Sequence, residues 1–166
     1  MRKAKISDLN KIEYIIEDAK RSLKEDGVDQ WQVRSLNRDF LKGQIEEGKS
    51  YVLDREAEVI AYCYLSDKKE KEYEGLDKLF KGQNYYTIHT FAIDRDLKEK
   101  RLGTRFLIEI IRLAESRGLD SLRVDTHEDN RKMRGLLNKL GFKKVGEILV
   151  DDDGEPKPRL AYELVL

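Results

Sequence analysis

The chain has 166 residues, a length typical of one domain with its own hydrophobic core, so we expect a single domain over residues 1–166. Lys and Arg number 33 and Asp and Glu number 33, and this zero net charge argues against a general nucleic-acid binder. No apolar run approaches the roughly 18 residues of a membrane span, no signal region precedes the first elements, and one cysteine excludes an internal disulfide, which predicts a cytoplasmic protein.

The first elements predicted are a strand and two helices. Residues 2–6 have the pattern of a short strand. A helix ending near Gly27 is predicted next, because apolar residues recur at spacings of three and four: Leu9, Ile12, Ile15, Ile16, Ala19 and Leu23. A second helix is expected from Ser35 to Glu47, with Gly48 as its stop signal.

A hairpin and an insertion follow. The stretch "SYVLDREAEVIAYCYL", residues 50–65, is typical of a β-hairpin, with its turn near residues 55–58. Residues 68–84 are rich in charge and are predicted to be irregular. Excursions of this length are often lids or binding loops.

The middle of the chain alternates strand, helix and strand. "YYTIHTFAID", residues 85–94, predicts a strand, and "SLRVDTH", residues 121–127, predicts another. Between them a helix runs to about Arg117 and stops at Gly118, because its apolar residues share one face: Leu102, Phe106, Leu107, Ile110, Ile111 and Ala114.

The last elements are a helix and two strands. Residues 130–140 predict a helix with Gly141 as its C-cap. Strands are expected over residues 143–150 and 159–166, joined by the turn "DDDGEPKP". A strand–helix–strand unit flanked by hairpins indicates a mixed α/β sheet with helices on its faces.

The start of the helix after residue 94 carries unexpected cations: Lys98, Lys100, Arg101 and Arg105. The positive end of the helix dipole normally favours acidic residues there. A bound phosphate would reverse this preference, and Gly103 and Thr104 would then supply close backbone approach and a hydroxyl donor. A solvated surface loop is the alternative interpretation.

The stretch "IHTFAIDRDLKEKRLGTRFL" resembles the GNAT superfamily of N-acetyltransferases, whose phosphate-binding turn reads [Gln/Arg]-x-x-Gly-x-[Gly/Ala]. Lys98 stands at the first position, Arg101 at the first glycine and Gly103 at the last position, so only Gly103 fits strictly. "LRVDTHEDNRKMRGLLNKLGFKKVGEI" looks like the second half of the family, and "DQWQ" and "GLDKLF" resemble a bacterial subgroup of small GNAT proteins.

This resemblance implies a fold and a reaction. The fold would be a mixed, mostly antiparallel sheet of about seven strands, splayed at the cofactor site, with about four helices on its faces. The reaction would be direct attack of a primary amine, on a small molecule or a protein, on the thioester of acetyl-CoA as cosubstrate. An acyl-CoA-binding regulatory module with little catalysis is the alternative, and a possible homodimer is also implied. A third interpretation is a protein-interaction domain that binds no cofactor.

The resemblance also assigns the cofactor contacts. The backbone of Arg101, Leu102, Gly103 and Thr104, together with Lys98, would hold the pyrophosphate. The exposed backbone of Phe91, Ala92 and Ile93 would pair with the pantetheine, and the N–H of Ile93 would meet the thioester oxygen. Asn130 would bind the pantetheine or cap its helix, or both. Lys132 and Met133 follow on that helix, and Arg131, Lys132 and Arg134 again crowd a helix start with cations, as phosphate contacts or as a solvated face.

His89 is the candidate base, and two histidines and one cysteine are too few for a zinc site. Strand alternation predicts that it shares a face with Thr87, Phe91 and Ile93. The resemblance places His89 where one branch of the family carries a proton-relaying histidine; a structural histidine is the alternative.

Many relatives carry a tyrosine as general acid at the position of Leu137, which cannot donate a proton. Tyr162 or a water would have to serve instead, although strand packing explains Tyr162 equally well.

The acceptor would lie between the first two helices and the insertion. Trp31 is a candidate aromatic wall for it, or else a core residue. Tyr73, together with Glu72 and Glu74, is a candidate to attract a cationic amine.

Overall fold

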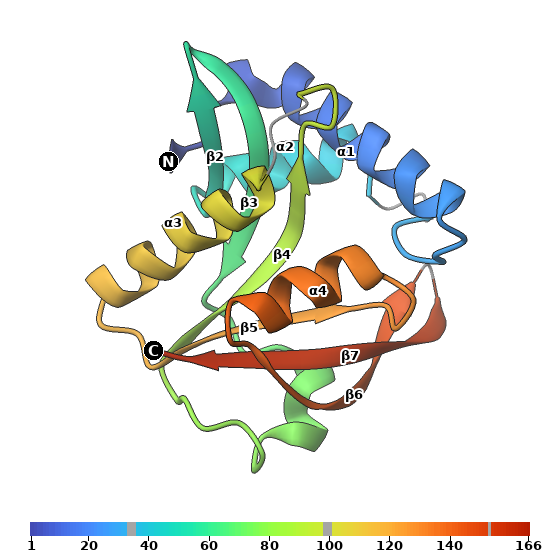
Figure 1. Ribbon diagram of the computed structural model, residues 1–166, viewed down its shortest axis with the longest axis vertical. Coiled ribbons are helices and arrows are strands. Elements are labelled where there is room, and N and C mark those ends of the chain that lie inside the picture. The colour runs from blue at the N-terminus through green and yellow to red at the C-terminus, as the bar shows by residue number, and fades with distance from the viewer. Residues whose placement is uncertain (33–35, 98–100, 153) are drawn as a thin grey trace.

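One mixed sheet of seven strands organises the computed structural model, which describes residues 1–32, 36–97, 101–152 and 154–166 (Figure 1). The strand order is β1-β2-β3-β4-β5-β7-β6. The strands are β1 (Arg2–Lys3), β2 (Ser50–Arg55), β3 (Glu58–Ser66), β4 (Tyr85–Ile93), β5 (Ser121–Thr126), β6 (Lys143–Asp152) and β7 (Glu155–Val165). The helices are α1 (Leu9–Glu25), α2 (Arg38–Glu46), α3 (Leu102–Ser116) and α4 (Arg131–Lys139), with short 3₁₀ helices η1 (Ile6–Asp8) and η2 (Lys71–Leu76).

Every neighbouring pair of strands is antiparallel except β4 and β5, which are parallel. The β4–β5 pairing joins Tyr85–Ile88 to Ser121–Val124 and goes no further along β4. The last five residues of β4 therefore diverge from β5, and a gap opens in the middle of the sheet. This splayed, mostly antiparallel sheet with four α-helices confirms the predicted fold class.

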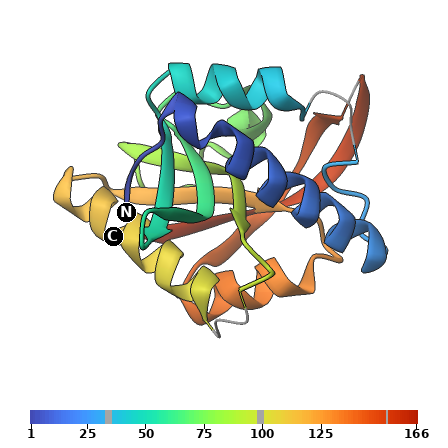
Figure 2. The same ribbon diagram turned by 90° about the horizontal axis from the view of Figure 1, so that it is seen from above.

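The helices cover both faces of the sheet (Figure 2). On one face α1 and α2 pack over a cluster that includes Ile12, Ile16, Leu41 and Tyr62. On the other face α3 and α4 pack over a larger cluster that includes Phe106, Ile110 and Leu137. The sheet is therefore the middle of three layers, and the gap between β4 and β5 connects its two faces.

The predicted ends of the first strand and of the second helix are wrong. The strand expected over residues 2–6 is only two residues long, because Lys5 already caps η1. The helix expected from Ser35 starts at Arg38, since the Asn37 side chain accepts a hydrogen bond from the Phe40 N–H and fixes the start. Ser35 itself lies outside the described residues.

The C-terminal turn is also shorter than predicted. Strands β6 and β7 continue through most of residues 151–158, with Asp151 opposite Pro156. Pairing of β5 with β7 ends at Leu160, so the start of β7 has only β6 beside it. Proline is tolerated there because no second neighbour needs its missing N–H.

A β-bulge at Thr90, whose φ is +53°, corrects the predicted face of β4. Two residues of β4 lie opposite one residue of β3 at this point, so side-chain alternation slips by one. Phe91 and Ile93 pack with the α3 core, whereas His89 lies opposite Tyr64 and faces the other side. Thr87 shares a face with His89 but not with Phe91 or Ile93.

The insertion at residues 68–84 is anchored to the sheet. It contains η2, and Tyr73 in η2 is 1% exposed in a cluster with Phe80, Ile148 and Ala161. The Tyr73 ring lies 5.4 Å from that of Phe80. Among the helices that the structure describes, none is long and apolar enough to cross a membrane.

Candidate active site

Two cavities meet at the gap in the sheet. The first, of about 440 Å³, lies between the end of β4 and helices α1, α3 and α4. The second, of about 550 Å³, lies between α2, the insertion and the β6–β7 hairpin. They share five lining residues: Gln30, Trp31, His89, Thr90 and Asp125. A molecule in one cavity can therefore touch a molecule in the other at this junction.

The edge of β4 supplies backbone donors to the first cavity. The Asp94 N–H donates to the Ile60 carbonyl of β3 at 2.9 Å. Because hydrogen-bonding direction alternates along an antiparallel strand, the N–H and C=O of Ile93 point away from β3 and into the gap. Phe91, Ala92 and Ile93 all line this cavity, as expected for residues whose backbone meets a ligand.

The start of α3 provides a second group of donors. Arg101 is its N-cap with φ +72°, a left-handed conformation that glycine adopts most easily. Leu102 is 1% exposed and packs in the α3 core, and Gly103 lines the first cavity. Thr104 uses its hydroxyl oxygen to accept a 3.4 Å hydrogen bond from Lys139. Lys98 lies outside the described residues.

Asn130 caps α4 and also borders the first cavity. Its side-chain oxygen accepts from the Met133 N–H at 3.1 Å, and its amide nitrogen donates to Gln30 Oε1 at 3.2 Å. The same Gln30 oxygen accepts from the Thr126 hydroxyl and the His127 N–H. Gln30 therefore ties the segment after α1 to the end of β5 and the start of α4. Met133 lines the cavity from the first turn of α4.

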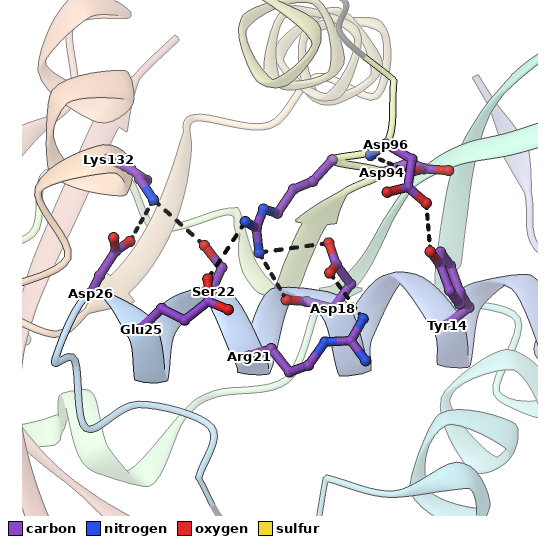
Figure 3. Close-up of polar contacts among 10 residues, drawn as sticks. Tyr14, Asp18, Arg21, Ser22, Glu25, Asp26, Asp94, Asp96 and Lys132 are labelled. Carbon is purple, nitrogen blue, oxygen red and sulfur yellow. Dashed lines mark hydrogen bonds and ion pairs between the residues drawn. The ribbon is translucent and has the colours of Figure 1, made fainter.

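Acidic residues in α1 and directly after its end face the cations at this cavity (Figure 3). Lys132 Nζ lies 2.5 Å from Asp26 Oδ2 and 3.5 Å from the Ser22 hydroxyl. Arg95, which follows β4, contacts Asp18 at 3.7 Å and Glu25 at 3.8 Å. Lys132 and Arg95, which line the cavity, thus have carboxylates opposite them in α1 or directly after its end.

His89 pairs with Glu70 at the junction of the cavities. Its Nε2 lies 3.0 Å from Glu70 Oε1, and the two side chains are 32% and 21% exposed. Burial lowers the pKa of His89, but the hydrogen bond to Glu70 and nearby carboxylates outweigh burial, so this pKa lies above its ordinary value. Burial raises the pKa of Glu70, but the bond to His89 outweighs it, and this pKa is lowered.

The two candidate acceptor residues are placed differently. Trp31 lines both cavities and holds φ at +63°, which is rare for a bulky residue. Tyr73 borders the second cavity, but its ring is buried in the core. Its hydroxyl donates to Asp125 Oδ2 at 3.0 Å, and burial raises the pKa of Asp125. The expected part of Tyr73 in attracting a cationic amine stays a prediction.

Neither Leu137 nor Tyr162 is placed as a proton donor. Leu137 is fully buried in the α3–α4 core, and Tyr162 is 3% exposed in the same cluster. Neither is among the described residues that line the two cavities. Packing thus explains Tyr162.

Three residues at the junction were missed by sequence reasoning: Gln30, Glu70 and Asp125. Glu70 lies in a segment with many charged residues, so no local signal separates it from its neighbours. Asp125 is the second-to-last residue of the buried strand β5, and its position near a strand end beside the predicted gap was a signal that could have found it.

Comparisons with known proteins agree with this geometry. Residues 12–142 match the model of the Acetyltransferase (GNAT) family. A GNAT-family acetyltransferase from Streptococcus agalactiae 2603 is similar, with TM-score 0.83 and 29% identity over 99% of this chain and 94% of that chain. One from Listeria monocytogenes 4b F2365 has TM-score 0.74 and 21% identity over 99% and 93%. A protein from Salmonella typhimurium, solved with its cofactor acetyl-CoA, has TM-score 0.70 and 18% identity over 99% and 92%. A comparison with curated proteins finds no match.

Proposed function

Because the chain belongs to the GNAT family of acetyltransferases, we propose that it transfers the acetyl group of acetyl-CoA to a primary amine of a small molecule or protein. The observation that carries this proposal is the meeting of two cavities at His89 and Thr90. One cavity suits the cosubstrate and the other suits the acceptor. Direct attack of the amine on the thioester needs both reactants at one point, which such a junction provides.

The first cavity fits acetyl-CoA by the chemistry of its donors. The backbone of Ile93 faces the gap, where it would hydrogen-bond the acetyl or pantetheine part. The N–H groups of residues 102–104, in the first turn of α3, would bind the pyrophosphate. Asn130 and Met133 would contact the pantetheine from α4.

His89 is the proposed base because it lines both cavities. The amine lone pair forms the N–C bond to the acetyl carbonyl, and the C–S bond breaks with its electron pair on sulfur. The proton lost by nitrogen goes to His89 through a water, and the thiolate takes a proton from solvent. Trp31 would lie against the acceptor.

A second candidate function is an acyl-CoA-binding module with little catalysis. The burial of Leu137, where many relatives carry a tyrosine acid, favours it. It predicts binding of acetyl-CoA without turnover, so one pair of measurements separates the two functions.

The test is calorimetric titration with acetyl-CoA, followed by an assay of thiol release. The amines are 2-phenylethylamine, 1,4-diaminobutane and a peptide with a free N-terminus. We expect micromolar binding and turnover on at least one amine, with His89→Ala lowering kcat about 100-fold. Arg112→Ala, on the exposed face of α3, is the matched control and should leave both unchanged. Binding without turnover on this panel would support the module instead, and absence of binding at millimolar ligand would overturn both.

A further inference from the structure

We propose that Glu70 is a positioning residue for His89, orienting its imidazole and stabilising the imidazolium that forms when His89 takes the amine proton. This inference rests on the proposed function. It also gives the insertion a role: this segment delivers a carboxylate to the junction of the two cavities rather than closing over it.

The position of Glu70 is set by the core. Glu70 is the N-cap residue of η2, and its carbonyl accepts from the Tyr73 N–H at 3.1 Å. Tyr73 is held by ring packing on Phe80 and by its hydroxyl on Asp125. Three residues after Glu70, the chain is thus fixed to the sheet by a side chain that is 1% exposed. The backbone that carries the Glu70 carboxylate is therefore held in place beside His89.

The contact also decides which nitrogen accepts the proton. When Nε2–H donates to the Glu70 carboxylate, the neutral imidazole carries its lone pair on Nδ1. The proton leaves the attacking nitrogen and reaches Nδ1 through the water, and the resulting cation is paired with the carboxylate through Nε2–H. The proton then passes to water, which restores neutral His89. A carboxylate that orients an imidazole in this way is a recurring arrangement in base catalysis.

Other charged groups surround His89 from each packed element. Asp125 on β5 and Glu72 on η2 both raise the pKa of His89, and the Tyr64 ring on β3 lies 6.3 Å from its ring. The second cavity also contains Lys68, Asp151 and Arg159. Lys68 lies 3.6 Å from Glu47, and Arg159 donates to two backbone carbonyls. Among the described residues, Glu70 is the one whose side chain hydrogen-bonds the imidazole, so it is the group to change.

The experiment compares Glu70→Gln with Asp77→Asn as the matched control. Both replace a carboxylate of the insertion by its amide, but Asp77 pairs with Lys69. The acid limb of kcat/KM against pH is measured for each variant with the best amine of the panel. The chain has two histidines, so NMR titration gives the pKa of His89 once His127→Gln assigns the other signal.

We expect the acid limb of the wild type to follow the His89 titration. Glu70→Gln should move the acid limb and the His89 titration to lower pH by the same amount, because the imidazolium loses its counter-charge. It should also lower kcat/KM on the plateau about tenfold. Asp77→Asn should move neither. If Glu70→Gln fails to fold, Glu70→Asp keeps the charge with a shorter reach, and it should lower the plateau while keeping the limb.

An unmoved limb in Glu70→Gln, or an unchanged plateau in Glu70→Asp, would overturn the role of Glu70 while leaving the transferase intact. A His89 titration that Glu70→Gln leaves unchanged would do the same. A wild type that acetylates no amine of the panel would instead remove the proposed function, and this inference with it.

Discussion

Lys132 Nζ, on the first turn of α4, lies 2.5 Å from Oδ2 of Asp26, directly after the end of α1 (Figure 3). This ion pair joins the two helices across one side of the first cavity, which Lys132 lines. Lys132 is 71% exposed, so solvent screens the pair and its strength is modest. A phosphate arriving in the cavity would compete with Asp26 for the same ammonium group.

Removing either partner should therefore change acetyl-CoA affinity in opposite directions. We expect Asp26→Asn to tighten binding about twofold to fivefold, because it frees Lys132, and Lys132→Met to weaken binding by a similar factor. Calorimetric titration measures both, and titration at higher salt should reduce the difference. Lys144→Met, which breaks a pair with Glu147 on β6, is the control. Weaker binding by Asp26→Asn would show that Lys132 does not meet the ligand.

Arg101→Gly should stabilise the fold. Arg101 holds φ at +72°, where an L side chain costs about 1 kcal/mol relative to glycine. Thermal unfolding should show a gain of about that size in the free energy of unfolding. The control is Arg131→Gly at the first residue of α4, a helical position, which should lose up to about 1 kcal/mol. Equal losses of unfolding free energy in Arg101→Gly and Arg131→Gly would contradict backbone strain at Arg101.

Trp31 should report ligand binding by its fluorescence. It is the only tryptophan of the chain and it lines both cavities. We expect acetyl-CoA to change the emission of Trp31. The dissociation constant fitted to this change should equal the one found by calorimetry. Adenosine 3′,5′-bisphosphate, which lacks the pantetheine and the acetyl group, should change it much less. An emission unaffected by saturating acetyl-CoA would place the ligand away from Trp31.

Stability should depend on pH through His89 and Glu70. The folded pKa of His89 lies above 6.5, so its contribution is complete below that value and is lost as pH rises through the folded pKa. The folded pKa of Glu70 lies below 4.5, so its contribution is present above that value and is lost at lower pH. The pair is therefore most stabilising near pH 5 to 6.5.

Glu70→Gln should lower the melting temperature more at pH 6 than at pH 9. The measurement is thermal unfolding in matched buffers, with Asp77→Asn as the control for general loss of charge. An equal decrease at both pH values would mean that the pair contributes no pH-dependent stability.

The sequence alone determined the helices, the hairpins and the class of the sheet. A helix is specified by residues three and four apart, so the stripe from Leu9 to Leu23 predicts α1 without knowledge of the rest of the chain. Turn signals near residue 56 likewise predict the β2–β3 hairpin, because its two strands are neighbours in sequence. The cations around Arg101 likewise predict a phosphate site at the start of α3, because they are neighbours in sequence.

Only the tertiary structure decided how side chains meet at the junction. The bulge at Thr90 depends on the pairing of β4 with β3, and it moves Phe91 and Ile93 away from the face of His89. Glu70 and His89 are 19 residues apart, and Tyr73 reaches Asp125 across 52 residues. Strand register and loop docking are set by burial of distant apolar side chains, which no local pattern encodes. The sequence predicts His89 as a candidate base, whereas its partner Glu70 is identified only by the packing of the insertion on the sheet.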